Sequence, residues 1–175
     1  RLYVAEMRGS GECGRGSAGA PERGYAPCGV VTEGPGGQGF GNAVGREVGW
    51  AQRAARYSRD GHAVIDHYTF LLVSDGDLME GVASEAASLA GHQCLGKLIC
   101  LYDDNRVTLA AGTPIAFTED RAARLEAYGW HTLHVEDGND VEAIASAIDA
   151  ARAETGKPAL ILGAHRHGFS PHEPA

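Results

Sequence analysis

The chain has 175 residues, a formal net charge of -8 at pH 7 and a hydrophobic fraction of 43%. At roughly 150 residues per domain, this length predicts a single domain. The negative charge argues against nucleic acid and anionic membranes as partners, whereas one phosphorylated ligand is compatible with it because a bound cation neutralises a phosphate locally. No apolar run approaches the ~20 residues of a membrane-spanning helix.

The cysteines predict the compartment. Cys13, Cys28, Cys94 and Cys100 show no CxxC spacing, and no signal-peptide pattern opens the chain. Free thiols in a reducing environment are the simplest interpretation. The sequence therefore predicts a cytoplasmic protein.

Composition divides the chain into three parts. Residues 1–37 are rich in glycine and other small residues, which predicts a loop or arm with little to bury. Residues 38–164 carry the apolar patterns of an α/β domain, beginning with an amphipathic helix from Phe40 to about Arg59. Residues 165–175, HRHGFSPHEPA, are predicted to be a tail.

Strand and helix patterns alternate after this first helix. Four segments are predicted to be strands, namely 68–73, 97–104, 130–136 and 159–164, and the first of them is a continuous apolar run of buried-strand length. Helices are predicted between them, one from about Val82, one capped by Thr118 and one capped by Asp140. Such alternation predicts a mainly parallel sheet with helices on both faces, which is a three-layer α/β sandwich.

Two of the predicted strands end in polar residues suited to metal binding. Asp75 and Gly76 follow the first strand, and Asn105 follows the second. Because ligands bind outside the carboxyl ends of parallel strands, Asp75 and Asn105 are expected at one edge of the sheet. Carboxylate, amide and backbone oxygens are ligands for Mg²⁺ or Ca²⁺, and phosphate oxygens complete the shell. The alternative is that these are ordinary polar loop residues.

These motifs carry a resemblance to the transketolase family. SDGDLMEG followed by YDDN is similar to the thiamine diphosphate motif, a Gly-Asp-Gly with an asparagine about thirty residues further on. EGPGGQGFGNAVG, RDGHAVIDHYTF and FTEDRAARLEAYGWH also resemble transketolase segments in order and spacing. The resemblance covers about Gly29 to Ile161 and implies the thiamine-diphosphate-binding fold, with thiamine diphosphate and Mg²⁺ or Ca²⁺ as cofactors.

The resemblance also implies a role for individual residues at the metal. Asp75 and Asn105 would bind the ion through their side chains, and Val107 would add its backbone carbonyl. Gly76 would present its backbone to the diphosphate.

Further positions follow from the same resemblance. Gly34 and Gly36 would lie near the thiazolium and aminopyrimidine rings of the cofactor. Glu80 would lie at a subunit interface, close to the point where two cofactor sites communicate. No catalytic residue is assigned in this chain.

The function implied is transfer of a two-carbon ketol unit, glycolaldehyde, between sugar phosphates, as in the pentose phosphate pathway. The family forms dimers, and its aminopyrimidine-binding domain would come from a second subunit or from a longer chain. Two alternatives remain open. The chain is a subunit of another thiamine-dependent ketol transferase, or it is a degenerate, non-catalytic domain that keeps the fold and an interface.

The chain departs from the family pattern at several positions, and among these Ala20, Gly36 and the tail favour the degenerate alternative. Ser74 replaces the first glycine of Gly-Asp-Gly, Gly36 stands where leucine is usual, and Ala20 stands where a substrate-contacting histidine is expected. The tail differs from the expected Gly-Tyr-Gly-Ser region. Intact metal-binding motifs at both strand ends argue in the opposite direction.

Overall fold

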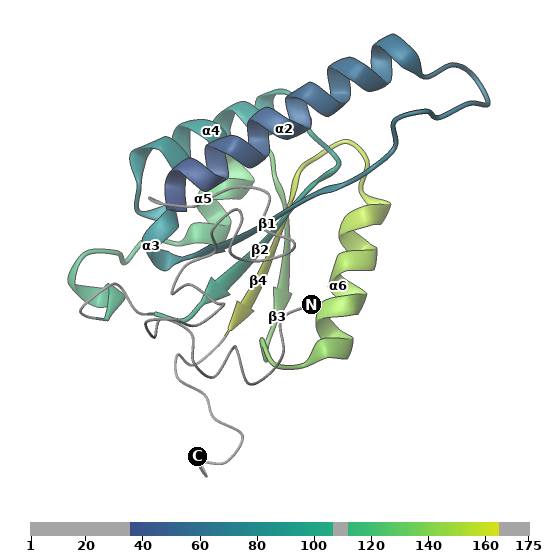
Figure 1. The fold of residues 1–175 in the computed structure, drawn as a ribbon. Helices are drawn as coiled ribbons and strands as arrows, with labels where there is room; N and C mark the ends of the chain where they lie inside the picture. Colours follow the sequence, from purple (N-terminus) through teal and green to yellow (C-terminus); the bar gives the residue numbers. More distant parts are fainter. Residues whose placement is uncertain (1–35, 107–111, 165–175) are drawn as a thin grey trace, which may run out of the picture.

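A computed structural model describes residues 36–106 and 112–164 of the chain (Figure 1). Gly34, Val107 and the predicted tail lie outside these described residues, as does most of the predicted arm. None of the helices in the described ranges is long and apolar enough to cross a membrane.

The described residues form a four-stranded parallel sheet with the order β1-β2-β4-β3. The strands are β1 (Thr69–Ser74), β2 (Leu98–Asp104), β3 (His131–Val135) and β4 (Ala159–Ala164). In the register of the sheet, Ser74 lies opposite Asp103, and Asp104 lies opposite Ala164. The carboxyl ends of β1, β2 and β4 therefore meet at one edge, as the sequence predicted.

Helices cover both faces of the sheet, which confirms the predicted three-layer α/β fold (Figure 1). On one face lie α2 (Gly36–Tyr57), α3 (Asp75–Leu78), α4 (Gly81–His92) and α5 (Arg121–Ala127). Their apolar residues share a core with the sheet that includes Phe40, Val44, Ala87, Leu98, Leu125 and Leu160. The opposite face carries α6 (Val141–Ala153), which packs on Ile99, Val135 and Ile161.

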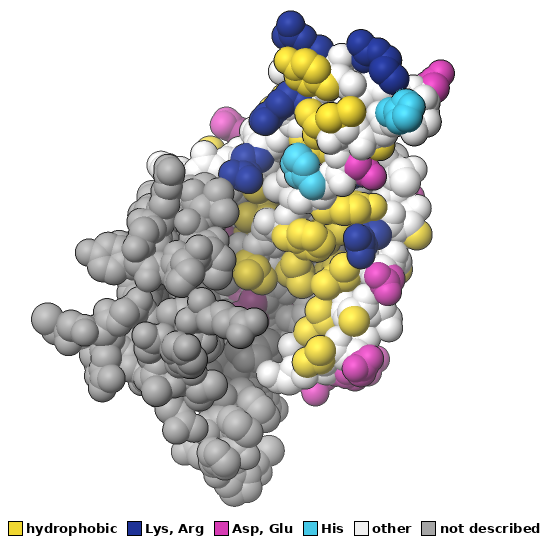
Figure 2. All heavy atoms as spheres, turned by 45° about the vertical axis from the view of Figure 1, so that its right-hand side comes forward, with side chains coloured by type: hydrophobic (Ala, Val, Ile, Leu, Met, Phe, Trp, Pro, Cys, Tyr) yellow, Lys and Arg dark blue, Asp and Glu magenta, His cyan; other side chains and the backbone are white. Residues whose placement is uncertain are grey.

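The face of the sheet that carries α6 is only partly covered. Phe70 and Leu72 of β1 point to this side and have exposed fractions of 51% and 74%. Figure 2 shows hydrophobic side chains gathered on this side of the molecule. The alternation of buried and exposed residues in β1 follows from the opposite directions of successive side chains in a strand.

Helix boundaries differ from the predictions where local contacts compete with periodicity. Asp140 caps α6 as predicted, because its carboxylate accepts hydrogen bonds from the N–H groups of Glu142 and Ala143, both at 3.0 Å. The predicted cap at Thr118 is wrong. Asp120 caps α5 instead, accepting from Ala123 N–H at 3.0 Å, since aspartate is the stronger cap.

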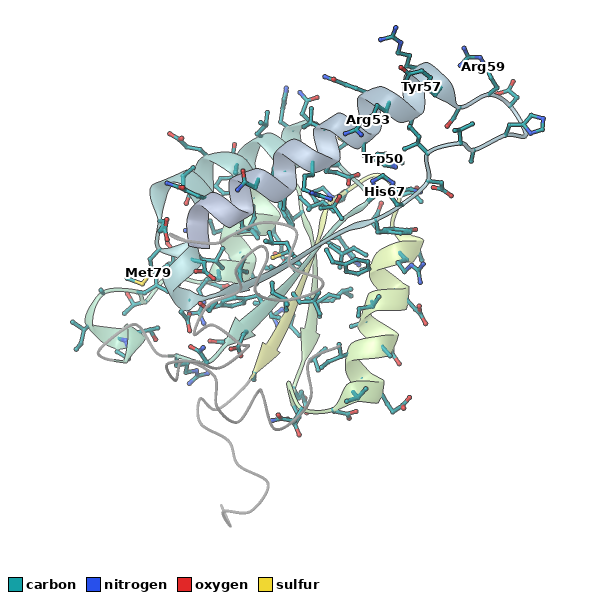
Figure 3. The ribbon with its side chains drawn as sticks, viewed as in Figure 1. Trp50, Arg53, Tyr57, Arg59, His67 and Met79 are labelled. Carbon is teal, nitrogen blue, oxygen red and sulfur yellow. The ribbon has the colours of Figure 1, made fainter. Side chains whose placement is uncertain are left out.

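Helix α2 begins at Gly36, four residues before the predicted start, and ends at Tyr57. Its first glycines allow a close approach, because a side chain at Gly36 would collide with Asp77, and one at Gly37 would collide with Glu80. The far end of α2, at Tyr57, extends past the sheet (Figure 3). Nearer the sheet, the rings of Trp50 and His67 lie edge to face, with their centroids 6.3 Å apart.

Candidate functional site

The carboxyl end of β1 continues directly into α3, a short helix that the sequence analysis missed. Asp77 holds this turn, because its Oδ2 accepts hydrogen bonds from the Ser74 N–H at 2.7 Å and the Ser74 hydroxyl at 3.2 Å. Ser74 thus has a local structural role in place of the glycine expected from the resemblance. The turn places Asp75 and Gly76 in the first turn of α3, above the end of the sheet.

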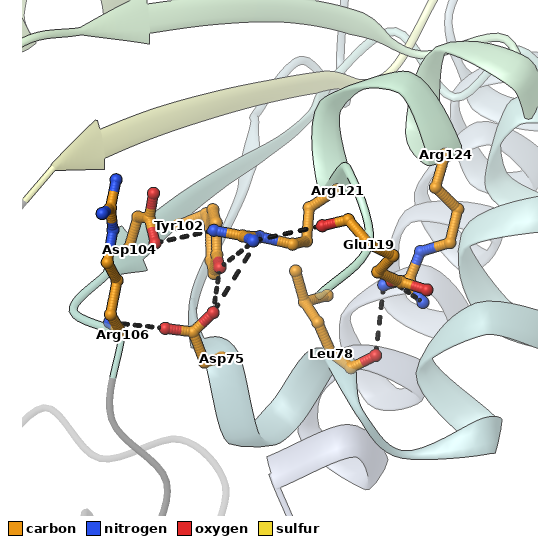
Figure 4. Close-up of polar contacts among 8 residues, drawn as sticks. All are labelled: Asp75, Leu78, Tyr102, Asp104, Arg106, Glu119, Arg121 and Arg124. Atoms are coloured by element: carbon orange, nitrogen blue, oxygen red, sulfur yellow. Dashed lines mark hydrogen bonds and ion pairs between the residues drawn. The ribbon is translucent and has the colours of Figure 1, made fainter. Parts of the chain in front are cut away.

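Asp75 is completely buried, and both of its carboxylate oxygens have hydrogen-bond donors. The Tyr102 hydroxyl of β2 donates to Oδ1, and the backbone N–H of Arg106 donates to Oδ2 at 2.7 Å (Figure 4). Burial raises the pKa of Tyr102, and its contact with Asp75 raises it further. The phenol therefore stays protonated and acts as a donor to the carboxylate.

Arg106 explains how the loop after β2 reaches Asp75. Its backbone adopts a left-handed conformation with φ of 56°, which is uncommon for a residue other than glycine. This turn directs the Arg106 N–H toward Asp75. Strained backbone of this kind is concentrated at functional sites, and the sequence contained no signal for it.

Asn105 precedes this turn, at the end of β2. Its amide nitrogen donates to Asp103 Oδ2 at 3.1 Å, which orients the side chain and directs the donor end of the amide to Asp103. The next residue, Arg106, contacts Asp75. The structure therefore places Asp75, at the start of α3, and Asn105, in the loop after β2, at the same edge of the sheet.

Arg121, in the first turn of α5, completes the polar cluster around Asp75 (Figure 4). Its Nε donates to the Tyr102 hydroxyl at 3.0 Å and lies 3.9 Å from Asp75 Oδ1. Its Nη2 donates to Asp104 Oδ1 at 2.7 Å. Burial lowers the pKa of Arg121, but Tyr102, Asp104 and Asp75 outweigh this effect and raise it.

Sequence reasoning missed Tyr102 and Arg121 as site residues. Tyr102 was hidden in an apolar strand. Arg121 carried a usable signal, because a cation in the first turn of a helix opposes the helix dipole and needs compensation elsewhere. Asp104 and Asp75 supply that compensation.

The residues at this edge fit a divalent ion bound to a diphosphate. Each carboxylate oxygen of Asp75 has a second lone pair beyond its one hydrogen bond from the N–H or O–H donor. Nothing lies within 4 Å of the position that a side chain at Gly76 would occupy, so a phosphate has space beside the backbone. The described residues contain no group of three His, Cys, Asp or Glu residues placed to bind a metal. The expected ligand set needs none, because an amide and a backbone carbonyl contribute to it.

Gly36 and Glu80, the other predicted residues within the described ranges, lie at the starts of helices. Gly36 is the first residue of α2 and lies against Asp77. Glu80 is the residue before α4 and is half-buried.

Comparison with known proteins identifies relatives of this chain. A family model described as "Transketolase, thiamine diphosphate binding domain" matches residues 2–172. A transketolase from Streptococcus pyogenes is 48% identical over 97% of this chain and 24% of its own length. One from Geobacillus stearothermophilus is 51% identical over 85% of this chain and 22% of its own length.

Solved structures similar to this chain are also transketolases. A transketolase from Pichia stipitis, in complex with sedoheptulose-7-phosphate, is 44% identical with a TM-score of 0.85, covering 93% of this chain and 24% of that one. Transketolase from Leishmania mexicana is 41% identical with a TM-score of 0.84, covering 94% and 25%. This chain spans about a quarter of the length of the relatives that it matches. Because the family model matches nearly all of its residues, the chain belongs to the transketolase family, within the thiamine diphosphate-binding domain.

Proposed function

We propose that Asp75, Asn105 and the backbone carbonyl of Val107 hold a divalent ion that binds the diphosphate of thiamine diphosphate. The observation that carries this proposal is the burial of Asp75 at the end of β1, with the β2 loop bonded to its carboxylate through Arg106. A diphosphate needs a bridging cation to approach a buried carboxylate. Magnesium or calcium suits the oxygen ligands.

The other residues of this chain position the cofactor. Gly76 gives the diphosphate access to the backbone at the start of α3. Gly34 and Gly36, which precede and begin α2, are proposed to lie beside the cofactor rings. When bound, thiamine diphosphate supplies the carbon nucleophile that takes up a two-carbon unit from a ketose.

For the whole protein, we propose ketol transfer between sugar phosphates. The Pichia stipitis relative is solved with sedoheptulose-7-phosphate, and another structure from that organism is solved with fructose-6-phosphate. The proposed partner is a domain that binds the aminopyrimidine, contributed by a second subunit or by a longer chain in a homodimer. Glu80, at the start of α4, is the proposed interface residue.

The proposal is tested by replacing Asp75 with asparagine. The chain is titrated calorimetrically with thiamine diphosphate, and separately with inorganic diphosphate, in Mg²⁺ and in chelator. We expect binding in Mg²⁺ and none in chelator. We expect Asp75→Asn to weaken binding by at least about 10- to 100-fold, because the loss of an outer-shell partner of a metal ligand already costs this much. Asp149→Asn, at a side chain that is 80% exposed on α6, is the matched control and should bind like the unmodified chain.

The titration also separates the alternatives. If Asp75→Asn binds as well as the unmodified chain while its circular dichroism is unchanged, the metal assignment is wrong. A non-catalytic domain is favoured by one observation, because both oxygens of Asp75 already have protein donors. That alternative predicts no binding of either diphosphate compound in Mg²⁺, even when the full-length protein is titrated.

A further inference from the structure

Arg121 brings a fixed positive charge into the cluster that contains Asp75. Its side chain and that of Asp104 are each only 17% exposed, and Asp75 is not exposed at all. The guanidinium bonds to Asp104 directly and reaches Asp75 through the Tyr102 hydroxyl. A buried carboxylate and a half-buried carboxylate thus share one half-buried cation.

We propose that Arg121 is the resident counter-cation of Asp75 and Asp104, and that a divalent ion at Asp75 binds against its repulsion. The second part rests on the proposed function, because it assumes that Asp75 is a metal ligand. The first part concerns the chain without metal and stands independently. Arg121 is thereby assigned as a positioning residue that sets how strongly the site depends on its metal.

The physical reason is the cost of a buried charge. A carboxylate without exposure is strongly destabilising when no opposite charge compensates it. Arg121 supplies that charge while the metal is absent. Once a divalent ion binds the same carboxylate, the two cations repel each other in a region of low dielectric constant, where such interactions are strong.

The surroundings of Arg121 also predict tighter binding of a divalent ion when the guanidinium charge is removed. Its side chain lines a pocket whose other walls include Asp104, Asp120 and Glu136. Loss of the guanidinium charge leaves this neighbourhood more negative, and a more negative neighbourhood attracts a divalent cation.

Packing is the competing explanation for Arg121. The guanidinium lies over the Tyr102 ring at 5.7 Å and over the Phe117 ring at 5.6 Å. Arg124, on the same helix, also lies over Phe117, at 5.8 Å, and pairs with Glu119 at 2.7 Å. None of its contacts in the described residues involves Asp75, so Arg124→Gln is a matched control with the same change of charge.

The first measurement uses the metal-free chain in chelator. Chemical denaturation is applied to Arg121→Gln, Asp75→Asn and the double variant. We expect Arg121→Gln to raise the equilibrium constant for unfolding about tenfold, and about twofold or less when Asp75 is already asparagine, since coupled contacts are non-additive. Arg124→Gln should act equally in both backgrounds. Equal effects of Arg121→Gln in both backgrounds would overturn the assignment of Arg121 as the counter-cation of Asp75.

The second measurement follows Mn²⁺ alone by electron paramagnetic resonance. The specific site is defined as the binding that Asp75→Asn removes. We expect Arg121→Gln to tighten this site about 3- to 10-fold through loss of charge repulsion, with Arg124→Gln within about twofold of the unmodified chain. Equal or weaker Mn²⁺ binding in Arg121→Gln would overturn the repulsion between Arg121 and the metal.

The two measurements separate the possible failures. If Asp75→Asn leaves Mn²⁺ binding unchanged, the proposed metal site is wrong, and the repulsion is overturned with it. The denaturation cycle still decides whether Arg121 compensates Asp75, because it contains no metal.

Discussion

Glu47 is a second buried carboxylate, and its environment differs from that of Asp75. It lies at the opposite end of β1, where its Oε2 accepts a hydrogen bond from the Thr69 hydroxyl at 2.7 Å. Its Oε1 has no hydrogen-bond partner among the described residues. Burial raises the pKa of Glu47, while Thr69, His67 and Lys97 oppose the rise. Charge at Glu47 is therefore costly, whereas charge at Asp75 is compensated.

This difference predicts a pH dependence of stability. The pKa of Glu47 is higher in the folded chain than in the unfolded chain. At pH values between these two pKa values, the folded state therefore keeps a proton that the unfolded state has lost. The free energy of unfolding should therefore fall as the pH rises from the unfolded value, near 4.5, through the raised folded value. Below about pH 4.5, Glu47 is protonated in both states, and it causes no loss of stability.

Glu47→Gln should remove this dependence. At neutral pH we expect the glutamine variant to be more stable than the unmodified chain, because glutamine has nearly the same shape as glutamate but brings no charge into the core. Urea denaturation at pH 4 to 8 measures it. Glu85→Gln, at an exposed position of α4, is the control and should follow the unmodified chain. A glutamine variant that loses stability with pH as the unmodified chain does would contradict the assignment.

Helices and strands could be predicted where the sequence carried one clear pattern, such as an apolar run or a periodic apolar face. Strands β1, β2 and β4 contain runs of apolar residues, and α6 has both a periodic apolar face and an aspartate cap, so each was found within a few residues of its observed bounds. The short helix α3 has no periodicity to detect. At α5, Thr118 and Asp120 competed as caps, and only the hydrogen bond to Ala123 decides between them.

Within the candidate site, the sequence predicted the positions of Asp75 and Asn105 but not the contacts around them. Asp75 and Asn105 follow strands, and parallel topology brings strand ends together. Tyr102 and Arg121 could not be predicted because their roles depend on tertiary contacts between β2 and α5. The left-handed turn at Arg106 is likewise a product of the folded chain.

Helix contacts predict opposite effects for two glycine substitutions. A side chain at Gly91 in α4 would collide with the backbone carbonyl of Tyr128 at the end of α5, whereas the exposed Gly45 in α2 has nothing within 4 Å. We expect Gly91→Ala to destabilise the chain by about 1–3 kcal/mol through overpacking. Gly45→Ala should stabilise it by about 0.5–1 kcal/mol, because alanine is the better helix former.

Thermal unfolding of both variants checks this prediction. Both substitutions add one methyl group to a helix. Opposite changes in stability would therefore reflect the close contact of α4 with the end of α5, which Gly45 lacks. A stabilising Gly91→Ala would show that α4 and α5 do not approach each other closely in solution.

At the scale of the whole molecule, the sheet has one well-covered face and one partly open face. Leu71 and Leu72 are neighbours in β1, and they point to opposite faces with exposed fractions of 5% and 74%. Exposed apolar area of this kind is available for contact with further protein. The two residues therefore offer a test of which face is covered in solution.

Leu71→Ala should lower the free energy of unfolding by about 2–5 kcal/mol, since it leaves a cavity in the core. Leu72→Ala should lower it by less than about 0.5 kcal/mol, as is usual at the surface. Chemical denaturation of both variants in the 175-residue chain provides the comparison. If Leu72→Ala costs as much as Leu71→Ala, then the open face is covered in solution.

The strand order has a consequence for synthesis on the ribosome. Because β4 lies between β2 and β3, the strand β3 emerges with no neighbour to pair with and waits until β4 has been translated. Strands β1 and β2, which are followed directly by Asp75 and Asn105, pair with each other much earlier. The end of the sheet that carries the proposed cofactor site is thus formed while β3 is still unpaired, and an unpaired strand is open to the misassociation that chaperones prevent.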